Sequence, residues 1–228
     1  FPDSAWEVLR SRGADLSGLR TISGEKTFRW QARYTGEMDS ATTLKTELNV
    51  LARPPEIPPS HEKADFLFLA NMGPDVQLAT LKKAQAARVW ADTMNLWIET
   101  QPDILRNVLK DLEGLFINEH EALQLTQAED LESAGRELLS AGPQVVVIKR
   151  GAKGALLCAH GLRPIAGEPR APVWKTLRFP AYPANPVIDP TGAGDSFAGG
   201  FLGSLARHKE SEWEKEFGLW DFLTLDKA

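Results

Sequence analysis

Residues 145–149, Val-Val-Val-Ile-Lys, form the most β-branched run in the chain and predict a buried central strand. Upstream of this run, short apolar segments alternate with longer amphipathic ones. The segments that predict strands are 66–70 (FLFLA), 88–92 (RVWAD) and 115–118 (LFIN). The segments that predict helices are 76–87, 102–112, 119–125 and 130–141. Because such alternation is typical of parallel βαβ units, we expect a three-layer α/β/α, doubly wound and mostly parallel sheet.

The N-terminal part has a different pattern. Residues 27–34 alternate polar and apolar side chains as a half-exposed strand does, and residues 42–51 alternate less regularly. Four prolines within residues 53–59 exclude a helix or a central strand and predict a stiff connector. We therefore expect a small β-sheet lid beside one α/β domain. The lid comprises residues 21–52, and the α/β domain comprises residues 1–20 and 53–228.

Composition narrows the class of protein. The 228 residues are 43% hydrophobic and 25% charged, with a formal net charge of -5, and no basic stripe offers a site for nucleic acid. Lys82, Lys83 and Arg88 are spaced like the solvated face of a helix. Cys158, the single cysteine, lies in an apolar run, which indicates a buried side chain and suits a reducing cytoplasm. No apolar stretch approaches the roughly 18 residues of a membrane helix.

Residues 189–200, DPTGAGDSFAGG, carry the chemistry. Gly192 and Gly194 permit unusual backbone angles and leave their N–H groups uncovered before an apolar helical run that extends to Leu205. Amides at a helix N-terminus favour an anion, most often a phosphate, because the helix dipole adds positive charge there. Asp195 would lie beside that anion. From these residues alone, a capped helix with Asp195 as a first-turn acid is an alternative interpretation.

Other phosphate and metal motifs are excluded. Gly-Lys-Ser/Thr occurs nowhere in the sequence, which rules out a Walker-type P-loop. The dinucleotide fingerprint requires a third glycine where this chain has Phe197, and it opens the first βαβ unit, whereas this motif comes last. The histidines have no ligand spacing, so a zinc site is not expected. These histidines are His61, His120, His160 and His208.

Three segments, in the expected order, resemble the ribokinase-like (PfkB) family of carbohydrate kinases. Residues 189–197 resemble the C-terminal signature of that family, and residues 116–122 (FINEHEA) resemble its Asn-x-x-Glu segment. Residues 147–155 (VIKRGAKGA) resemble its nucleotide-binding strand and turn. The resemblance spans roughly residues 64–208. It implies the family's α/β fold with a lid, and an activity that uses ATP and Mg²⁺.

The resemblance also implies catalytic roles within the signature. Asp195 would accept the proton of the substrate hydroxyl, at the basicity of an ordinary carboxylate. The backbone amides of Gly192, Ala193 and Gly194 would form a hole for the charge that develops on the transferred group. No covalent intermediate with the protein is needed, because phosphoryl transfer requires mainly orientation of the reactants and stabilisation of charge.

Further residues match the nucleotide and magnesium positions of the family. Asn118 and Glu121, spaced i, i+3, would share a helix face and order Mg²⁺ largely through water. Lys149 would reach the nucleotide phosphates from a strand end, with Gly151 and Gly154 in the turn that follows. Taken alone, Glu121 is also compatible with a solvated helix residue and Lys149 with a residue at a sheet edge.

Two pairs of residues are candidate contacts, one pair for a monovalent cation and the other for the substrate. Asp189 and Thr191 match positions at which many family members bind a monovalent cation, usually K⁺, and Pro190 replaces a threonine at a position not expected to ligate it. Asp92 and Asn95 follow a predicted strand where relatives carry polar side chains that face the site. They are candidate substrate contacts, and a strand-end turn is an equally good account of both.

Both ends of the sequence depart from the family. The first strand, an aspartate for substrate hydroxyls and a Gly-Gly-Asn-like segment have no counterpart, and residues 1–18 resemble the helix and turn that follow them. We therefore expect a piece of a longer protein that lacks much of the sugar pocket. Residues 209–228 predict a surface helix without an assigned role. In several family members the lid forms a dimer interface, so a homodimer through residues 21–52 is a further expectation.

Together these features predict a cytoplasmic, ATP-dependent kinase that phosphorylates a primary hydroxyl of a sugar or sugar-like small molecule. A nucleoside kinase of the same fold is the nearest alternative, because the pocket that separates the two classes has no counterpart in the sequence. An alternative of another class is a catalytically silent nucleotide-binding module. The intact Asp195 argues against that module, and the short ends argue for it.

Overall fold

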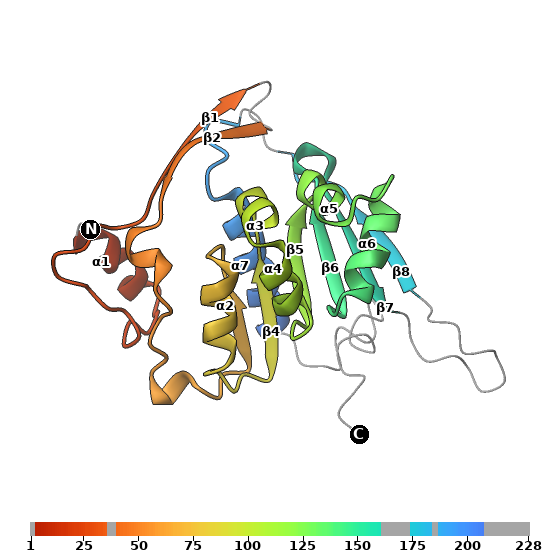
Figure 1. Ribbon diagram of the computed structural model, residues 1–228. Coiled ribbons are helices and arrows are strands. Elements are labelled where there is room, and N and C mark those ends of the chain that lie inside the picture. Colours follow the sequence, from red (N-terminus) through yellow and green to blue (C-terminus); the bar gives the residue numbers. More distant parts are fainter. Residues whose placement is uncertain (1–2, 36–39, 161–173, 184–186, 208–228) are drawn as a thin grey trace.

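The computed structural model describes residues 3–35, 40–160, 174–183 and 187–207. Its centre is a six-stranded sheet with the order β3-β4-β5-β6-β7-β8 (Figure 1). The strands are β3 (Phe66–Leu69), β4 (Arg88–Asp92), β5 (Gly114–Asn118), β6 (Val145–Lys149), β7 (Ala155–His160) and β8 (Trp174–Phe179). Strands β3 to β6 are parallel to one another, whereas β7 and β8 are added antiparallel. The sheet is therefore mixed and mostly parallel, as the sequence predicted.

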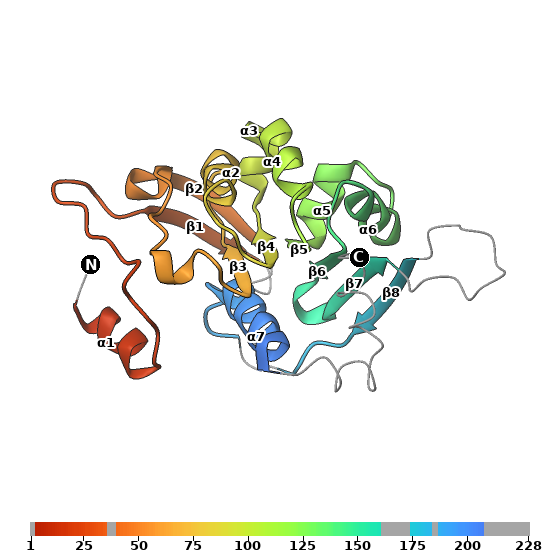
Figure 2. The same cartoon turned by 90° about the horizontal axis from the view of Figure 1, so that it is seen from below.

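Helices cover both faces of this sheet, as Figures 1 and 2 show. One face carries α2 (Pro74–Leu81), α3 (Asn95–Thr100), α4 (Pro102–Leu109), α5 (Glu119–Thr126) and α6 (Leu131–Ser140). The opposite face carries α7 (Ala193–Arg207), which lies below the sheet in Figure 2. Strands β3 to β6 are joined through helices on the first face, and because they are parallel, their carboxyl ends all point to the same edge.

The two faces explain why the strand sequences are apolar without interruption. Ile117 and Ile148 point into the core under α2 to α6, whereas their neighbours Phe116 and Val147 point toward α7. Because successive side chains of a strand point to opposite faces, a strand covered on both sides needs apolar residues at every position. Gly114 is required by packing, since a Cβ there would lie 2.2 Å from the buried ring of Trp90.

A two-stranded antiparallel hairpin forms the lid. Strands β1 (Arg29–Thr35) and β2 (Ser40–Glu47) pair with a bulge between Gln31 and Ala32. The hairpin arches from the N-terminal side toward the carboxyl edge of the sheet, with its tip above α3 and α7 in Figure 1. Helix α1 (Asp3–Ser11) precedes the lid, and η1 (Asn49–Ala52) and η2 (Pro59–His61) lie between the lid and β3. The expected homodimer through this lid stays a prediction.

The elements agree with the sequence in outline but depart from it in several places, and strand β8 was not predicted at all. The helix expected over 76–87 ends at Leu81, and the short helix α3 was not predicted because six residues are too few for a periodic pattern. Strand β7 turns back antiparallel through η3 (Gly151–Lys153), a turn too short for a parallel crossover. The segment 209–228, predicted as a surface helix, lies outside the described residues. Within the described ranges, no helix is long and apolar enough to cross a membrane.

Candidate active site

Three predicted site residues meet where parallel strands end. Asp92 is the last residue of β4 and pairs with Phe116, while Asn118 ends β5 and pairs with Lys149, the last residue of β6. This register places the three strand ends side by side at the carboxyl edge of the sheet. In open α/β sheets this edge is where ligands bind.

A buried ion pair joins two of these strand ends. The Lys149 Nζ atom donates to Asp92 Oδ2 at 2.9 Å and to Asp92 Oδ1 at 3.2 Å, and the two side chains are 19% and 6% exposed. The backbone amide of Thr93 donates a further hydrogen bond to Asp92 Oδ1 at 2.8 Å. Burial raises the pKa of Asp92, and the charge of Lys149 opposes that rise. Both carboxylate oxygens of Asp92 are therefore bound within the chain.

Asn118 and Glu121 form a capping box at the start of α5. The Glu121 amide donates to Asn118 Oδ1 at 2.8 Å, and the Asn118 amide donates to Glu121 Oε2 at 3.0 Å. Glu121 is buried, so the interpretation as a solvated helix residue is wrong. Burial raises the pKa of Glu121 to about 7; Asp92 reinforces this rise, while the Asn118 amide and Lys149 oppose it. We call Asp92, Glu121 and Lys149 the strand-end cluster.

The residues 189–195, which we call the glycine loop, turn sharply into α7. Asp189 Oδ1 accepts a hydrogen bond from the Thr191 amide at 2.9 Å, and this bond lowers the pKa of Asp189. Gly192 has a φ of 78°, which a side chain would strain, and the Ser196 amide donates to its carbonyl at 2.8 Å. Asp195 lies exposed in the first turn of α7.

Two expectations for this loop need correction. Gly194 does not have a positive φ, since it already belongs to α7. Packing explains the glycine at this position, because a Cβ at Gly194 would lie 3.2 Å from Lys149 Nζ. The amide of Ala193, one of the three predicted for the anion hole, donates to the Pro190 carbonyl at 3.1 Å. Within the loop, the Ala193 amide thus supports the turn.

The turn after Lys149 is built around two glycines. Gly154 has a φ of 89°, and a Cβ there would lie 1.9 Å from the Phe179 carbonyl oxygen of β8. Gly151 has a φ of 54° with open space where a side chain would project. Strand pairing therefore explains Gly154, while Gly151 leaves room above the end of β6.

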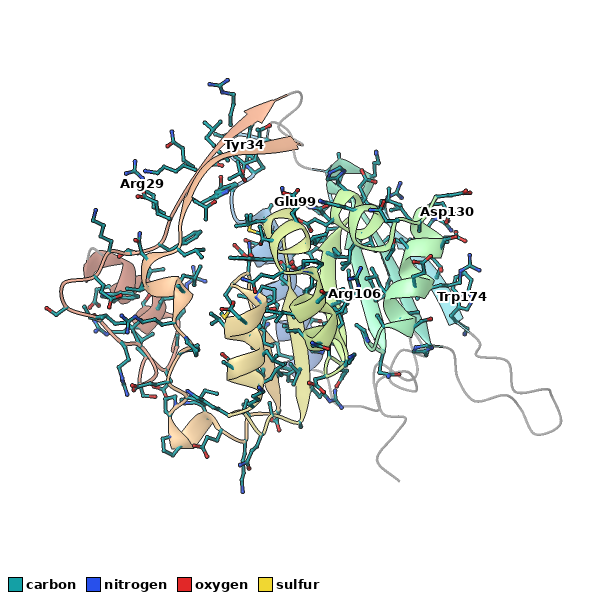
Figure 3. All side chains as sticks on the ribbon, in the orientation of Figure 1. Arg29, Tyr34, Glu99, Arg106, Asp130 and Trp174 are labelled. Atoms are coloured by element: carbon teal, nitrogen blue, oxygen red, sulfur yellow. The ribbon has the colours of Figure 1, made fainter. Side chains whose placement is uncertain are left out.

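The lid approaches the glycine loop directly. The hydroxyls of Tyr34 and Thr191 lie 3.2 Å apart, a hydrogen bond between residues far apart in the sequence. An open hollow of about 380 Å³ lies between β2 of the lid and α3, lined by Thr42, Thr43, Asn95, Leu96 and Glu99. Figure 3 shows Tyr34 near the tip of the lid and Glu99 on α3, at the same end of the molecule. Asn95, a candidate substrate contact, thus faces the hollow under the lid.

The structure thus groups most of the predicted residues at one edge. Lys149 links the strand-end cluster to Gly194, and through α7 to Asp195. Asp189 and Thr191 lie in the loop that leads into the same helix, beneath Tyr34. Sequence reasoning missed Tyr34, whose only signal was its place on an alternating strand. Among the described residues, no group of three His, Cys, Asp or Glu side chains forms a ready metal site.

The lysine and the glycine loop fit a nucleotide phosphate. The ammonium of Lys149 lies at the N-terminal turn of α7, where backbone amides and the helix dipole also favour an anion. The Lys149 ammonium is hydrogen-bonded to Asp92, so it balances the negative charge of the buried Glu121 carboxylate only in part. Glu121 is left with a deficit of nearby positive charge. That deficit suits an added cation such as Mg²⁺ held through water.

Comparisons with known proteins show the family and the fold of this chain. The chain is 34% identical over 226 residues to a cytidine kinase of Thermococcus kodakarensis. The matched region covers 96% of this chain and 75% of that protein. Its fold is similar to that of an aminoimidazole riboside kinase of Salmonella enterica, with a TM-score of 0.67, 20% identity, and coverage of 97% and 72% of the two chains. It is also similar to a Burkholderia thailandensis nucleoside kinase, with a TM-score of 0.66, 19% identity, and coverage of 96% and 68%.

A profile of the family described as pfkB family carbohydrate kinase matches residues 22–219. This match covers most of the chain, including the lid, the strand-end cluster and the glycine loop. Together with the identity to the cytidine kinase, it shows that the protein belongs to the pfkB family of carbohydrate kinases, which are phosphotransferases with an alcohol group as acceptor.

Proposed function

We propose that the protein is an ATP-dependent kinase that transfers the γ-phosphoryl group to a sugar hydroxyl of a nucleoside. The observation that carries the kinase activity is the position of the Lys149 ammonium beside Gly194, one residue before Asp195. The 34% identity to a cytidine kinase favours a nucleoside, and cytidine first, over a free sugar. A free sugar remains the alternative acceptor, as the family's description indicates.

In this proposal, Asp195 is the catalytic base. Its carboxylate is exposed, so it is accessible to an acceptor hydroxyl, and it stands at the helix terminus where the phosphate would bind. Asp195 would accept the hydroxyl proton as the oxygen attacks the γ-phosphorus, while the bond from that phosphorus to the bridging β-phosphate oxygen breaks and ADP leaves. The amides of Gly192 and Gly194 would donate to the transferred group, and Lys149 would neutralise part of its charge.

Glu121 and Asn118 would hold Mg²⁺ through water beside the nucleotide phosphates. When bound, the metal supplies charge neutralisation between the phosphates. The buried Glu121 carboxylate is well suited to this task, because its charged form is unfavourable until a cation is added. Asp189 and Thr191 would take K⁺ at the base of the glycine loop. Equal rates in sodium, potassium and choline salts would contradict the K⁺ assignment.

The acceptor would bind between the lid and α3. The hollow there offers the hydroxyls of Thr42 and Thr43, the amide of Asn95 and the carboxylate of Glu99, a set that suits a polyhydroxylated molecule. The Glu99 carboxylate also accepts from Gln124 Nε2 at 3.0 Å, which fixes its orientation. Shape and hydrogen bonding at this hollow would decide between nucleosides.

An acceptor panel tests this proposal. ATP consumption would be measured with pyrimidine nucleosides, purine nucleosides, pentoses, hexoses and inositol, each with Mg²⁺ and K⁺. We expect the highest kcat/KM with a pyrimidine nucleoside. A higher kcat/KM with a free sugar would move the protein to the alternative acceptor class.

A further inference from the structure

The ion pair between Asp92 and Lys149 spans three strands. Asp92 ends β4 and Lys149 ends β6, and β5 lies between them in the sheet. The lysine side chain therefore crosses above the end of β5 to reach both Asp92 oxygens, at 2.9 and 3.2 Å. A lysine on a free four-carbon stem has many rotamers, so this contact selects one of them.

The selected position is the one that faces the glycine loop. The Lys149 Nζ atom lies 3.2 Å from where a Cβ of Gly194 would be, which puts the ammonium against the first turn of α7. The competing carboxylate of Glu121 is engaged by the Asn118 amide. Asp92 is thus the group that draws the ammonium across β5 and leaves it beside the helix terminus.

Asp92 itself is poorly placed to bind an acceptor. Its side chain is 6% exposed, and its oxygens accept hydrogen bonds from Lys149 and from the Thr93 amide. A carboxylate so enclosed has little capacity left for a substrate hydroxyl. Asn95, which follows it by three residues, instead lines the open hollow under the lid.

We propose that Asp92 is a positioning residue that acts through Lys149: it holds the ammonium at the N-terminal turn of α7, where the nucleotide phosphates would bind. This inference rests on the proposed function and deepens it, because it assigns Asp92 to the phosphate half of the site and removes it from the acceptor half. It also predicts that the effect of changing Asp92 requires Lys149 to be present.

A double-mutant cycle tests the inference. Affinity for ATP would be measured by calorimetry, without turnover, for wild type, Asp92→Asn, Lys149→Met and the double variant. Asp92→Asn keeps the size of the side chain and its hydrogen bond from Thr93. We expect it to weaken ATP binding about tenfold, because an ammonium that is no longer held in place would lose one charge-assisted contact with the phosphates. In the Lys149→Met background the same change should have almost no effect.

Three further measurements separate this role from a structural one. Asp103→Asn removes the carboxylate of an exposed ion pair with Arg106, 3.2 Å apart on α4, and should leave ATP affinity unchanged. Asp92→Glu restores the charge and should recover part of the lost affinity. The KM for the acceptor should not change in Asp92→Asn.

The outcomes distinguish the inference from the function beneath it. The positioning role is wrong if wild type binds ATP and the Asp92→Asn variant binds it equally well. It is also wrong if that substitution raises only the acceptor KM. In both cases the kinase proposal stands. Equal losses in both backgrounds would also contradict the positioning role, because Asp92 would then act without Lys149. If wild type does not bind ATP, the proposed function fails and this inference fails with it.

Discussion

The strand-end cluster and the glycine loop meet at Lys149, but they are built in different ways. In the cluster, Asp92 and Glu121 are buried and bonded to neighbouring backbone, so their geometry is set by the packing of the sheet. In the loop, Asp195 and Thr191 are exposed and are held by local turns and one contact with the lid. In the proposed function, the strand-end cluster is therefore the buried half of the site, fixed by the sheet before substrate binds. The glycine loop is the exposed half, which depends on local turns and on its contact with the lid.

The largest effect should follow from a change in the exposed half. Asp195→Asn removes the proposed base and keeps the shape of the first turn of α7. We expect kcat to fall by about two to four orders of magnitude, with thermal stability and ATP affinity unchanged. Steady-state kinetics beside ATP calorimetry checks this prediction. A variant that retained its kcat would remove Asp195 from the mechanism.

A change in the buried half should act on stability instead. Glu121→Gln keeps the acceptor for the Asn118 amide and removes a charge from a buried site. Because burial raises the pKa of Glu121 from 4.5 to about 7, wild type has the full stability of the protonated form below pH 4.5 and loses it as the pH rises through 7. At pH 8, without metal, the variant should exceed wild type by up to about 3 kcal/mol.

Denaturant unfolding between pH 5 and pH 8 measures that difference. The free energy of unfolding of wild type should fall across this range more steeply than that of Glu121→Gln. Parallel pH profiles for the two proteins would show that Glu121 is charged at pH 5, and would contradict the buried environment described here.

Gly194→Ala tests the junction between the two halves. The added methyl group would lie 3.2 Å from Lys149 Nζ and should displace the ammonium, so we expect ATP affinity to fall several-fold. Gly199→Ala is the matched control on the same helix, because no described atom lies within 4 Å of its Cβ position. The control should keep ATP affinity and gain up to about 1 kcal/mol of stability from helix propensity. Equal ATP affinities in the two variants would contradict the account.

The smallest effect is expected at the lid. Tyr34→Phe removes only the hydroxyl that meets Thr191 at 3.2 Å. Because a neutral, exposed hydrogen bond contributes about 1 kcal/mol, we expect the acceptor KM to rise by a few-fold at most. ATP affinity and the melting temperature should not change. A loss of ATP affinity in this variant would show that the lid also organises the phosphate half.

The sequence predicts the local parts of this site better than the contacts that assemble it. The i, i+3 spacing of Asn118 and Glu121 indicated the start of a helix, where the structure has a capping box. The β-branched run indicated the strand that ends at Lys149. The Asp92–Lys149 pair was not predictable, because it depends on the order and register of three strands. The contact between Tyr34 and Thr191 depends on how the lid folds over the sheet, which no local pattern encodes.

Product stoichiometry tests the central claim most directly. Wild-type protein would be incubated with ATP, Mg²⁺, K⁺ and cytidine, and both ADP and phosphorylated cytidine would be quantified. We predict equal amounts of the two products, formed at a rate that Asp195→Asn lowers by about two to four orders of magnitude. ATP binding with neither product, across every nucleoside and sugar tried, would contradict the account and identify a catalytically silent nucleotide-binding module.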